Sequence, residues 1–230
     1  MKVLESVRSL VFLGSLPQAR AFAAGCAERT SVVLLRSLDL AGRADDLAAC
    51  RAAVDLLWSP HPRPAAVPEL LRHLHALPEL HGPGAVAGLD VLARTGARAL
   101  YSALVLAASP EDRGGPGGAV EPSLFARDFA RELYFHGAKR LPAEEDGAQN
   151  HDVSLIMSLR AAELAASLAS LRAKAAEEGR YRLALAVTGC TSQSPVPASR
   201  APGPMSPAPG PASRAPGHAV RRRDGLPRPA

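Results

Sequence analysis

The sequence predicts an all-α protein with a disordered, proline-rich C-terminal tail. Of its 230 residues, 45 are Ala and 32 are Leu, and both residue types favour helices. Val, Ile and Thr together number only 20 and aromatic residues make up 4%, whereas strands favour β-branched and aromatic side chains. The prolines are unevenly placed, because 10 of the 21 fall in residues 188–230. The composition therefore separates a helical body from a tail.

The first predicted element is an amphipathic helix that ends at Gly14. Val7 and Leu10 recur at helical spacing, and glycine is a common helix stop. The apolar run that closes this helix imitates a secretory signal. However, Glu5 and Arg8 lie where the apolar core of such a signal should begin, and Glu5 also disfavours a mitochondrial presequence. We therefore expect a cytoplasmic or nuclear protein.

Two kinds of helical segment recur along the first half of the chain. Val54–Arg63 matches Leu104–Arg113 at an offset of 50, and each contains a Ser-Pro pair followed by Arg. Val11–Ser15 matches both less closely, while Leu34–Leu38 and Leu70–Leu74 are a second recurring, Leu-rich type. The pattern predicts long apolar helices that end near a proline and alternate with Leu-rich helices.

The stretch Leu10–Leu38 resembles the junction between two armadillo or HEAT-type helical repeats. In it an apolar helix ends at a proline-containing turn, a short helix precedes Gly25, and a Leu-Leu helix follows. The resemblance extends over roughly the first 113 residues. It implies that residues 1–109 form an armadillo-like solenoid fragment whose concave groove binds another protein. An irregular helical bundle stays open as the alternative.

The second Leu-rich helix supplies the candidate partner-binding surface. His73, His75 and His81 lie near this helix but do not suggest a metal site. On a helix the side chains of His73 and His75 point about 200° apart. We interpret the histidines as surface and groove residues. The candidate groove residues are Leu70, Leu71, His73, Leu74, His75 and Leu77.

A glycine- and proline-rich stretch, residues 110–122, predicts a linker between two helical regions. It lacks the preceding strand that a phosphate-binding loop requires. Residues 123–187 predict the second helical region, which opens with a helix over Leu124–Ala138 capped by Ser123. Residues 144–147, Glu-Glu-Asp-Gly, are interpreted as a solvated acidic loop.

A long helix is predicted from Asp152 to Glu178, ending at Gly179. One set of its apolar residues recurs at alternating spacings of four and three, the heptad period of packed helices. A second, flatter stripe lies beside this seam. We expect the two stripes to pack against the helices Leu124–Ala138 and Leu89–Leu106. The heptad seam consists of Met157, Ala161, Leu164, Leu168, Leu171 and Ala175, and the flatter stripe of Leu155, Leu159, Ala162, Ala166 and Ala169.

No motif in the chain identifies a reaction, so the leading hypothesis is a non-enzymatic scaffold or adaptor that binds proteins. An alternative comes from His151-Asp152, because helical metal-dependent phosphohydrolases use such a pair together with further His and Asp ligands. Asp128 and His136 are the nearest candidates for those ligands in the sequence. Asp152 also suits the N-cap of a helix. The leading hypothesis assigns no catalytic residue, metal or cofactor.

The cysteine pattern and the lengths of the apolar runs argue against a disulfide-rich, a zinc-binding and a membrane-spanning protein. Cys26, Cys50 and Cys190 are odd in number and widely spaced, so they predict neither a disulfide framework nor a zinc site. The uncharged stretch 99–110 is too short to cross a bilayer. We therefore expect no membrane span.

The positive charge belongs to the tail. Residues 188–230 contain six arginines and one aspartate, which equals the net charge of +5 of the whole chain. Arg221, Arg222 and Arg223 form a basic patch that suits an acidic surface or a nucleic acid. A nucleic-acid-associated protein that acts through this tail is therefore the second alternative.

Overall fold

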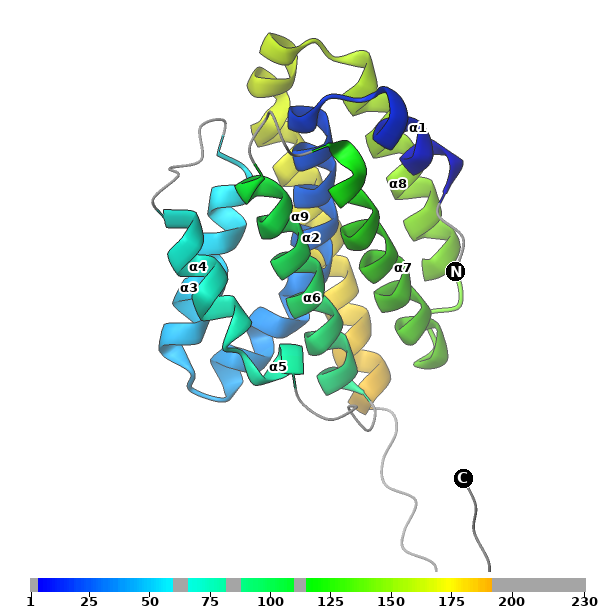
Figure 1. Ribbon diagram of the computed structural model, residues 1–230. Helices are drawn as coiled ribbons and strands as arrows, with labels where there is room; N and C mark the ends of the chain where they lie inside the picture. Colours follow the sequence, from blue (N-terminus) through cyan, green and yellow to red (C-terminus); the bar gives the residue numbers. More distant parts are fainter. Residues whose placement is uncertain (1–3, 60–65, 82–87, 110–114, 192–230) are drawn as a thin grey trace, which may run out of the picture. The chain divides into compact units, whose positions relative to one another are not determined.

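The computed structural model describes residues 4–59, 66–81, 88–109 and 115–191. All regular structure in these ranges is helical, which confirms the predicted all-α class (Figure 1). The helices are α1 (Glu5–Leu13), α2 (Leu16–Leu40), α3 (Ala44–Leu57), α4 (Ala66–His75), α5 (Pro78–His81), α6 (Leu89–Ala108), the 3-10 helix η1 (Pro116–Ala119), α7 (Val120–Phe135), α8 (Leu141–Ser158) and α9 (Ala161–Thr191).

The chain divides into two units by its internal contacts, residues Met1–Ser194 and Pro195–Ala230. The first unit contains all of the helices in the described ranges. The predicted basic patch of Arg221, Arg222 and Arg223 lies outside the described residues, so its role stays a prediction.

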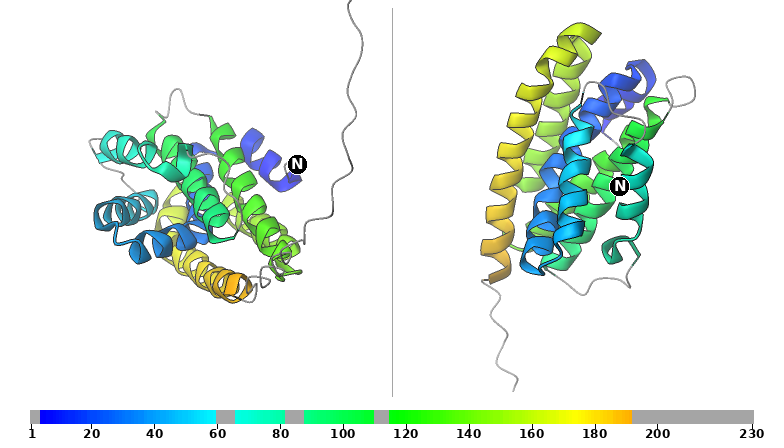
Figure 2. Two further views of the ribbon diagram at one scale, coloured as in Figure 1. Left: turned by 90° about the horizontal axis from the view of Figure 1, so that it is seen from below. Right: turned by 90° about the vertical axis from the view of Figure 1, so that its left-hand side faces the viewer.

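Helix α2 is the central helix of the first unit. It lies in the middle of Figures 1 and 2, with α6 and α7 on one side and α9 on the other. It contacts α3, α6, α7, α8 and α9, and its contacts with α6 and α9 are the most extensive. Helices from both halves of the sequence therefore share one core, and α4 packs outside α2, against α3 and α6.

Small residues allow the backbones of the central helices to approach closely. A Cβ atom at Gly96 of α6 would lie 2.6 Å from the carbonyl oxygen of Thr30 in α2. At Gly179 of α9 it would lie 2.9 Å from Cγ1 of Val32 and 3.2 Å from the carbonyl oxygen of Glu28. These two glycines thus set the distances of α6 and α9 from α2.

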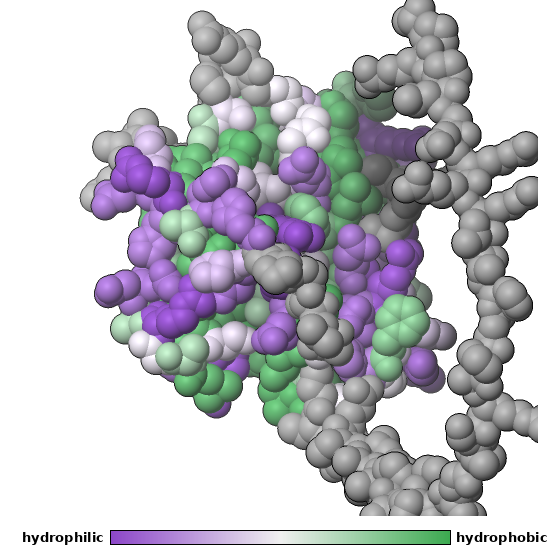
Figure 3. All heavy atoms as spheres, turned by 60° about the horizontal axis from the view of Figure 1, so that its bottom comes forward, coloured by the Kyte–Doolittle hydropathy of each residue, from purple (hydrophilic) through white to green (hydrophobic). Residues whose placement is uncertain are grey.

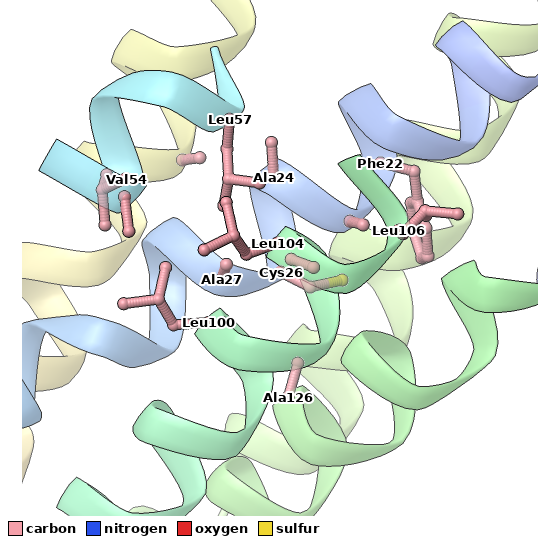
Figure 4. Close-up of a cluster of buried hydrophobic side chains, with 14 of the residues drawn as sticks. Phe22, Ala24, Cys26, Ala27, Val54, Leu57, Leu100, Leu104, Leu106 and Ala126 are labelled. Carbon is pink, nitrogen blue, oxygen red and sulfur yellow. The ribbon is translucent and has the colours of Figure 1, made fainter. Parts of the chain in front are cut away.

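The core between α2, α3 and α6 combines these small residues with leucines. In Figure 4, Leu100 and Leu104 of α6 lie beside Ala24 and Ala27 of α2, all of them buried, and Leu57 of α3 completes the layer. Burying a leucine side chain contributes about 1.5–3 kcal/mol. The alternation of large and small side chains lets neighbouring helices interdigitate.

Helix α2 is continuous through Gly25, so the predicted break between a short helix and a Leu-Leu helix is wrong. Ser15 caps the helix, because its side chain accepts a hydrogen bond from the backbone N–H of Gln18 and its own N–H donates to the Gln18 side chain. Gly25 instead lies where Arg29 and Asp152 approach the helix, and a Cβ there would be 3.4 Å from the Arg29 guanidinium. The helices that pack along both sides of α2 offset the weak helix propensity of this glycine.

The predicted linker, residues 110–122, is partly helical. Its described part forms η1 and the first turn of α7, which begins at Val120. Ser123 is therefore not the N-cap of this helix. Its buried hydroxyl donates a hydrogen bond to Oε1 of Gln149 at 2.7 Å and ties α7 to α8. A proline in the first turn of α7 is tolerated because N–H groups there lack intrahelical partners.

The single long helix predicted in the second half is two helices, α8 and α9. The side-chain amide of Gln18 donates to the carbonyl oxygens of Ile156 at 3.1 Å and Leu159 at 3.2 Å, which satisfies the end of α8. The backbone N–H of Arg160 donates to Glu163 at 2.8 Å and starts α9. The break is stabilised by side chains that form hydrogen bonds with the unpaired backbone groups at the two helix ends.

Neither predicted end of that long helix is an end. Asp152 lies inside α8, and Gly179 lies inside α9 at its close approach to α2. The heptad seam is correct in part: Leu164, Leu171 and Ala175 are buried, but Ala161 is exposed and Met157 lies on α8. The main contacts of α9 are with α2 instead of the two helices predicted to cover it. The residues Ala162, Ala166 and Ala169 of the flatter stripe are exposed.

Helix α6 is the one described helix that is long and apolar enough to cross a membrane by length and composition. More than half of it is buried inside the unit, against α2 and its neighbours. The central helix of a packed bundle has the same composition, so this helix is weak support for a membrane span.

Candidate functional site

The interior of the first unit holds a cluster of ionisable side chains from three helices. We call it the buried ion cluster: Arg29 of α2, Glu145 and Asp152 of α8, and Lys174 and Arg182 of α9. Arg29, Glu145 and Arg182 are at most 2% exposed. Charged side chains are almost never buried to this extent unless they are paired.

Asp152 is held by two cations. Its Oδ2 lies 2.6 Å from Nη1 of Arg29, and its Oδ1 lies 2.8 Å from Nζ of Lys174. Arg29 also approaches Glu178 at 3.5 Å. Both oxygens of Asp152 therefore accept charge-assisted hydrogen bonds, the strongest class in proteins.

Glu145 is held by the second arginine. Its Oε2 accepts a hydrogen bond from Arg182 and lies 3.6 Å from Nε of Arg29, while its Oε1 accepts from Nε2 of Gln149 at 2.6 Å. Gln149 in turn donates to the carbonyl oxygen of Ser123 at 3.1 Å. The network joins α2, α7, α8 and α9.

The pairing changes the pKa values of these carboxyl groups. Burial alone would raise the pKa of Glu145, but Arg182 and Arg29 hold this pKa below its ordinary value. Burial would likewise raise the pKa of Asp152, but Arg29 and Lys174 hold it low. Both carboxylates are therefore charged at neutral pH and are compensated within the protein.

A small cavity of about 10 Å³ lies beside Asp152, lined mainly by apolar side chains and by Gly25 and Trp58. It has room for about one water molecule and none for an organic substrate. The ion pairs of the cluster join α2, α8 and α9.

The sequence pattern did not predict this cluster. Residues 144–147 were predicted to form a solvated acidic loop, but they lie in α8, where Glu145 is fully buried. A periodic signal was present, since Lys174, Glu178 and Arg182 recur every four residues on one face of a helix. Charges in the heptad frame of an apolar seam indicate a buried ionic contact.

The structure separates the residues of the metal-site alternative. His151 is exposed, whereas Asp152 is buried and both its oxygens are engaged by cations. In the described part of the chain, no group of three or more His, Cys, Asp or Glu side chains could hold a metal ion. His136 instead lies 3.3 Å from Glu132, on the same helix end.

The predicted partner-binding residues fall into two groups. Leu74 and Leu77 are buried in the core, at 1% and 2% exposed, so they are not available to a partner. The reason is that α4 packs on α3 and α6. Leu70, Leu71 and His73 are partly exposed, and His75 is exposed.

The histidines near α4 make local contacts. Nε2 of His73 lies 2.8 Å from Oδ1 of Asp46 in α3. The rings of His75 and His81 are 4.5 Å apart, and His75 also lies 5.8 Å from the ring of Tyr101. These contacts hold α4 and α5 to their neighbours.

Large apolar side chains are exposed in groups at two places on the unit, and four others, Leu40, Val105, Leu155 and Val187, are also exposed. At the end of α1, Phe12 and Leu13 are 80% and 77% exposed. At the other place, Tyr134 and Phe135 end α7 and Tyr181 lies on α9, and the three are 38–65% exposed. Sequence periodicity did not identify these residues as a group, because they come from the ends of different helices.

Cys26 and Cys50 are buried free thiols. Burial raises the pKa of each to about 12. Both are therefore protonated and poor nucleophiles at neutral pH.

The chain was compared with family models, with curated proteins and with solved structures, and none of them matches it.

Proposed function

We propose that the protein is a non-enzymatic adaptor that binds other proteins through apolar side chains exposed on its helical body. The observation that carries the proposal is the grouping of these side chains into Phe12–Leu13 and Tyr134, Phe135 and Tyr181. Large apolar residues on monomeric proteins are normally scattered singly. Aromatic residues are also enriched where proteins meet.

The ionisable groups of the interior support the same proposal. The carboxylates of the buried ion cluster are paired with cations, and the cavity beside Asp152 is too small for a substrate. Active sites instead hold titratable groups in a cleft that admits a ligand. The buried ion cluster thus serves the stability and rigidity of the surface that binds.

The arrangement around α2 favours an irregular helical bundle over stacked armadillo-like repeats. In a solenoid each repeat contacts only its neighbours, whereas α2 contacts α7, α8 and α9 from the far end of the unit. In our proposal the partner therefore binds an outer surface of the bundle and not a concave groove.

The tail supports a second candidate, binding to nucleic acid. Its six arginines against one aspartate would release counterions from a phosphate backbone. Binding that weakens steeply between 50 and 200 mM salt, and that is lost when the chain is cut after Thr191, would support this function.

The adaptor proposal is tested by quantitative co-purification with the full chain. We compare the wild type with Phe12→Glu/Leu13→Glu, with Phe135→Glu/Tyr181→Glu, and with the control Ala162→Glu/Ala166→Glu on the exposed stripe of α9. A protein retained in stoichiometric amount by the wild type and the control, but lost from either patch variant, supports the proposal. Retention of no such protein, or equal retention by all four chains, overturns it.

A further inference from the structure

One end of the helical unit carries a connected aromatic and basic surface. The ring of Phe135 lies 5.6 Å from that of Tyr134, and Nζ of Lys139 lies 4.1 Å from the Tyr134 ring centroid. Lys139 also lines a hollow of about 400 Å³ together with Tyr181 and Leu185 of α9. We call these five residues the end patch.

The end patch is held in place by close helix packing. A Cβ atom at Gly189 of α9 would lie 2.6 Å from the carbonyl oxygen of His136, which directly follows α7. The ends of α7 and α9 are thus in contact, and their exposed side chains share one surface. This end of the unit is turned forward in Figure 3, where apolar and hydrophilic side chains are interspersed.

The chemistry of the end patch fits a protein partner. Phe135 is 65% and Tyr181 is 52% exposed, so they offer two large rings whose burial would drive association. Rigid aromatic anchors beside basic groups are typical of the residues that dominate binding energy. The hollow between α9 and the connection from α7 to α8 can receive an apolar side chain from the partner.

The charge of the surface determines which partner fits. Lys139 and Arg140 line the hollow together with one acid, Glu144. Two cations against one acid at the hollow favour an acidic partner, because complementary charges steer association and exclude like-charged partners.

We propose that the end patch binds an acidic segment of another protein that inserts apolar side chains into the hollow beside Tyr181. This assignment rests on the proposed adaptor function and names its site and the chemistry of its partner. The chain's own C-terminal tail does not fit, because residues 188–230 carry a net charge of +5. A single-stranded nucleic acid fits less well, because Lys139 lies over the Tyr134 ring on which a base would stack.

The test is photo-cross-linking in cells with the full chain. A benzophenone amino acid replaces Phe135 or Tyr181, and in a third chain it replaces Phe12, which lies outside the end patch. The cross-linked peptides are then sequenced. We expect adducts from positions 135 and 181 on peptides rich in Asp and Glu. In the background Lys139→Glu/Arg140→Glu, the yield should fall about ten-fold, equivalent to a loss of about 1.4 kcal/mol.

The matched control is Arg51→Glu/Arg72→Glu, which makes the same change of charge at exposed residues of α3 and α4 and should leave the yield unchanged. The inference is overturned by adducts on nucleic acid, lipid, or neutral or basic peptides. An absence of adducts, or equal yields in both charge-reversed chains, also overturns it. If position 12 captures a protein while positions 135 and 181 do not, the adaptor function stands and only the end patch fails.

Discussion

Replacing Glu145 with Gln should be strongly destabilising, although the two side chains have nearly the same shape. Glu145 is fully buried, and its partners Arg29 and Arg182 are 1% and 2% exposed. The substitution leaves two buried guanidinium groups with one compensating carboxylate fewer. Breaking a buried pair in this way costs about 3–5 kcal/mol, a large part of a total stability of about 5–15 kcal/mol.

The assay is urea unfolding followed by circular dichroism at 222 nm. With a slope of about 2 kcal/mol per molar urea, the expected loss lowers the midpoint by about 1.5–2.5 M. The matched control is Glu144→Gln, because Glu144 precedes it in the same helix and is exposed. That control should change stability by less than about 0.5 kcal/mol. Equal midpoints for the two variants would refute the reasoning.

The same carboxylate predicts how stability depends on pH. The pKa of Glu145 is lowered in the folded protein from its ordinary value of 4.5. Its contribution is therefore complete above about pH 4.5 and is lost as the pH falls toward the folded pKa. Glu145→Gln should flatten the stability profile below pH 4.5. A variant as acid-sensitive as the wild type would contradict this assignment.

Three further outcomes follow from the packing. Gly96→Ala should cost about 1–3 kcal/mol through overpacking against the Thr30 carbonyl, whereas Gly147→Ala, with open space around it, should not destabilise; equal melting temperatures would contradict the close approach. Cys26 and Cys50, with pKa values near 12, should resist a thiol reagent at pH 8 until the protein unfolds, and rapid labelling of either in the native state would contradict their burial. Deleting residues 192–230 should leave the helicity and the melting temperature nearly unchanged, because all described helices end by Thr191; a drop of many degrees would show that the tail stabilises the body.

The sequence predicted those helix ends that are determined by residues close to them in the chain. The stop at Gly14 and the helix that begins at Leu89 were predicted from helix propensity, apolar spacing and glycine alone. The break between α8 and α9 was not, because the Gln18 side chain that satisfies it comes from 138 residues away in sequence. Tertiary contacts of this kind override the continuous helical pattern around Leu159.

The candidate sites were less predictable for the same reason. Glu145 is surrounded in sequence by acids and a glycine, which is typical of a solvated loop, and its partners Arg29 and Arg182 are remote in the chain. Leu74 was expected in an open groove, but its burial depends on how α4 packs on α3 and α6. Amphipathic spacing identifies an apolar face, but it does not show whether that face meets the same chain or another one.

Helix α9 offers a direct test of which apolar stripe holds the body together. Leu164 belongs to the seam and is 4% exposed, while Ala166 lies on the exposed stripe two residues later. Leu164→Glu would bury a charge without a partner at the contact between α9 and the bundle, which costs several kcal/mol. We expect that variant to lose helicity or to aggregate in size-exclusion chromatography. Ala166→Glu should stay monodisperse and fully helical.

The opposite pattern, a folded Leu164→Glu and an unfolded Ala166→Glu, would place the other stripe of α9 against the bundle. If both variants fold, neither stripe is essential, and α9 would be held chiefly by the pairs that Lys174 and Arg182 form with α8. Combining Leu164→Glu with Glu145→Gln then separates the two contributions. If the losses of unfolding free energy of the two single variants add in the double variant, the apolar seam and the buried ion cluster stabilise α9 independently. If they do not add, the two form one cooperative contact.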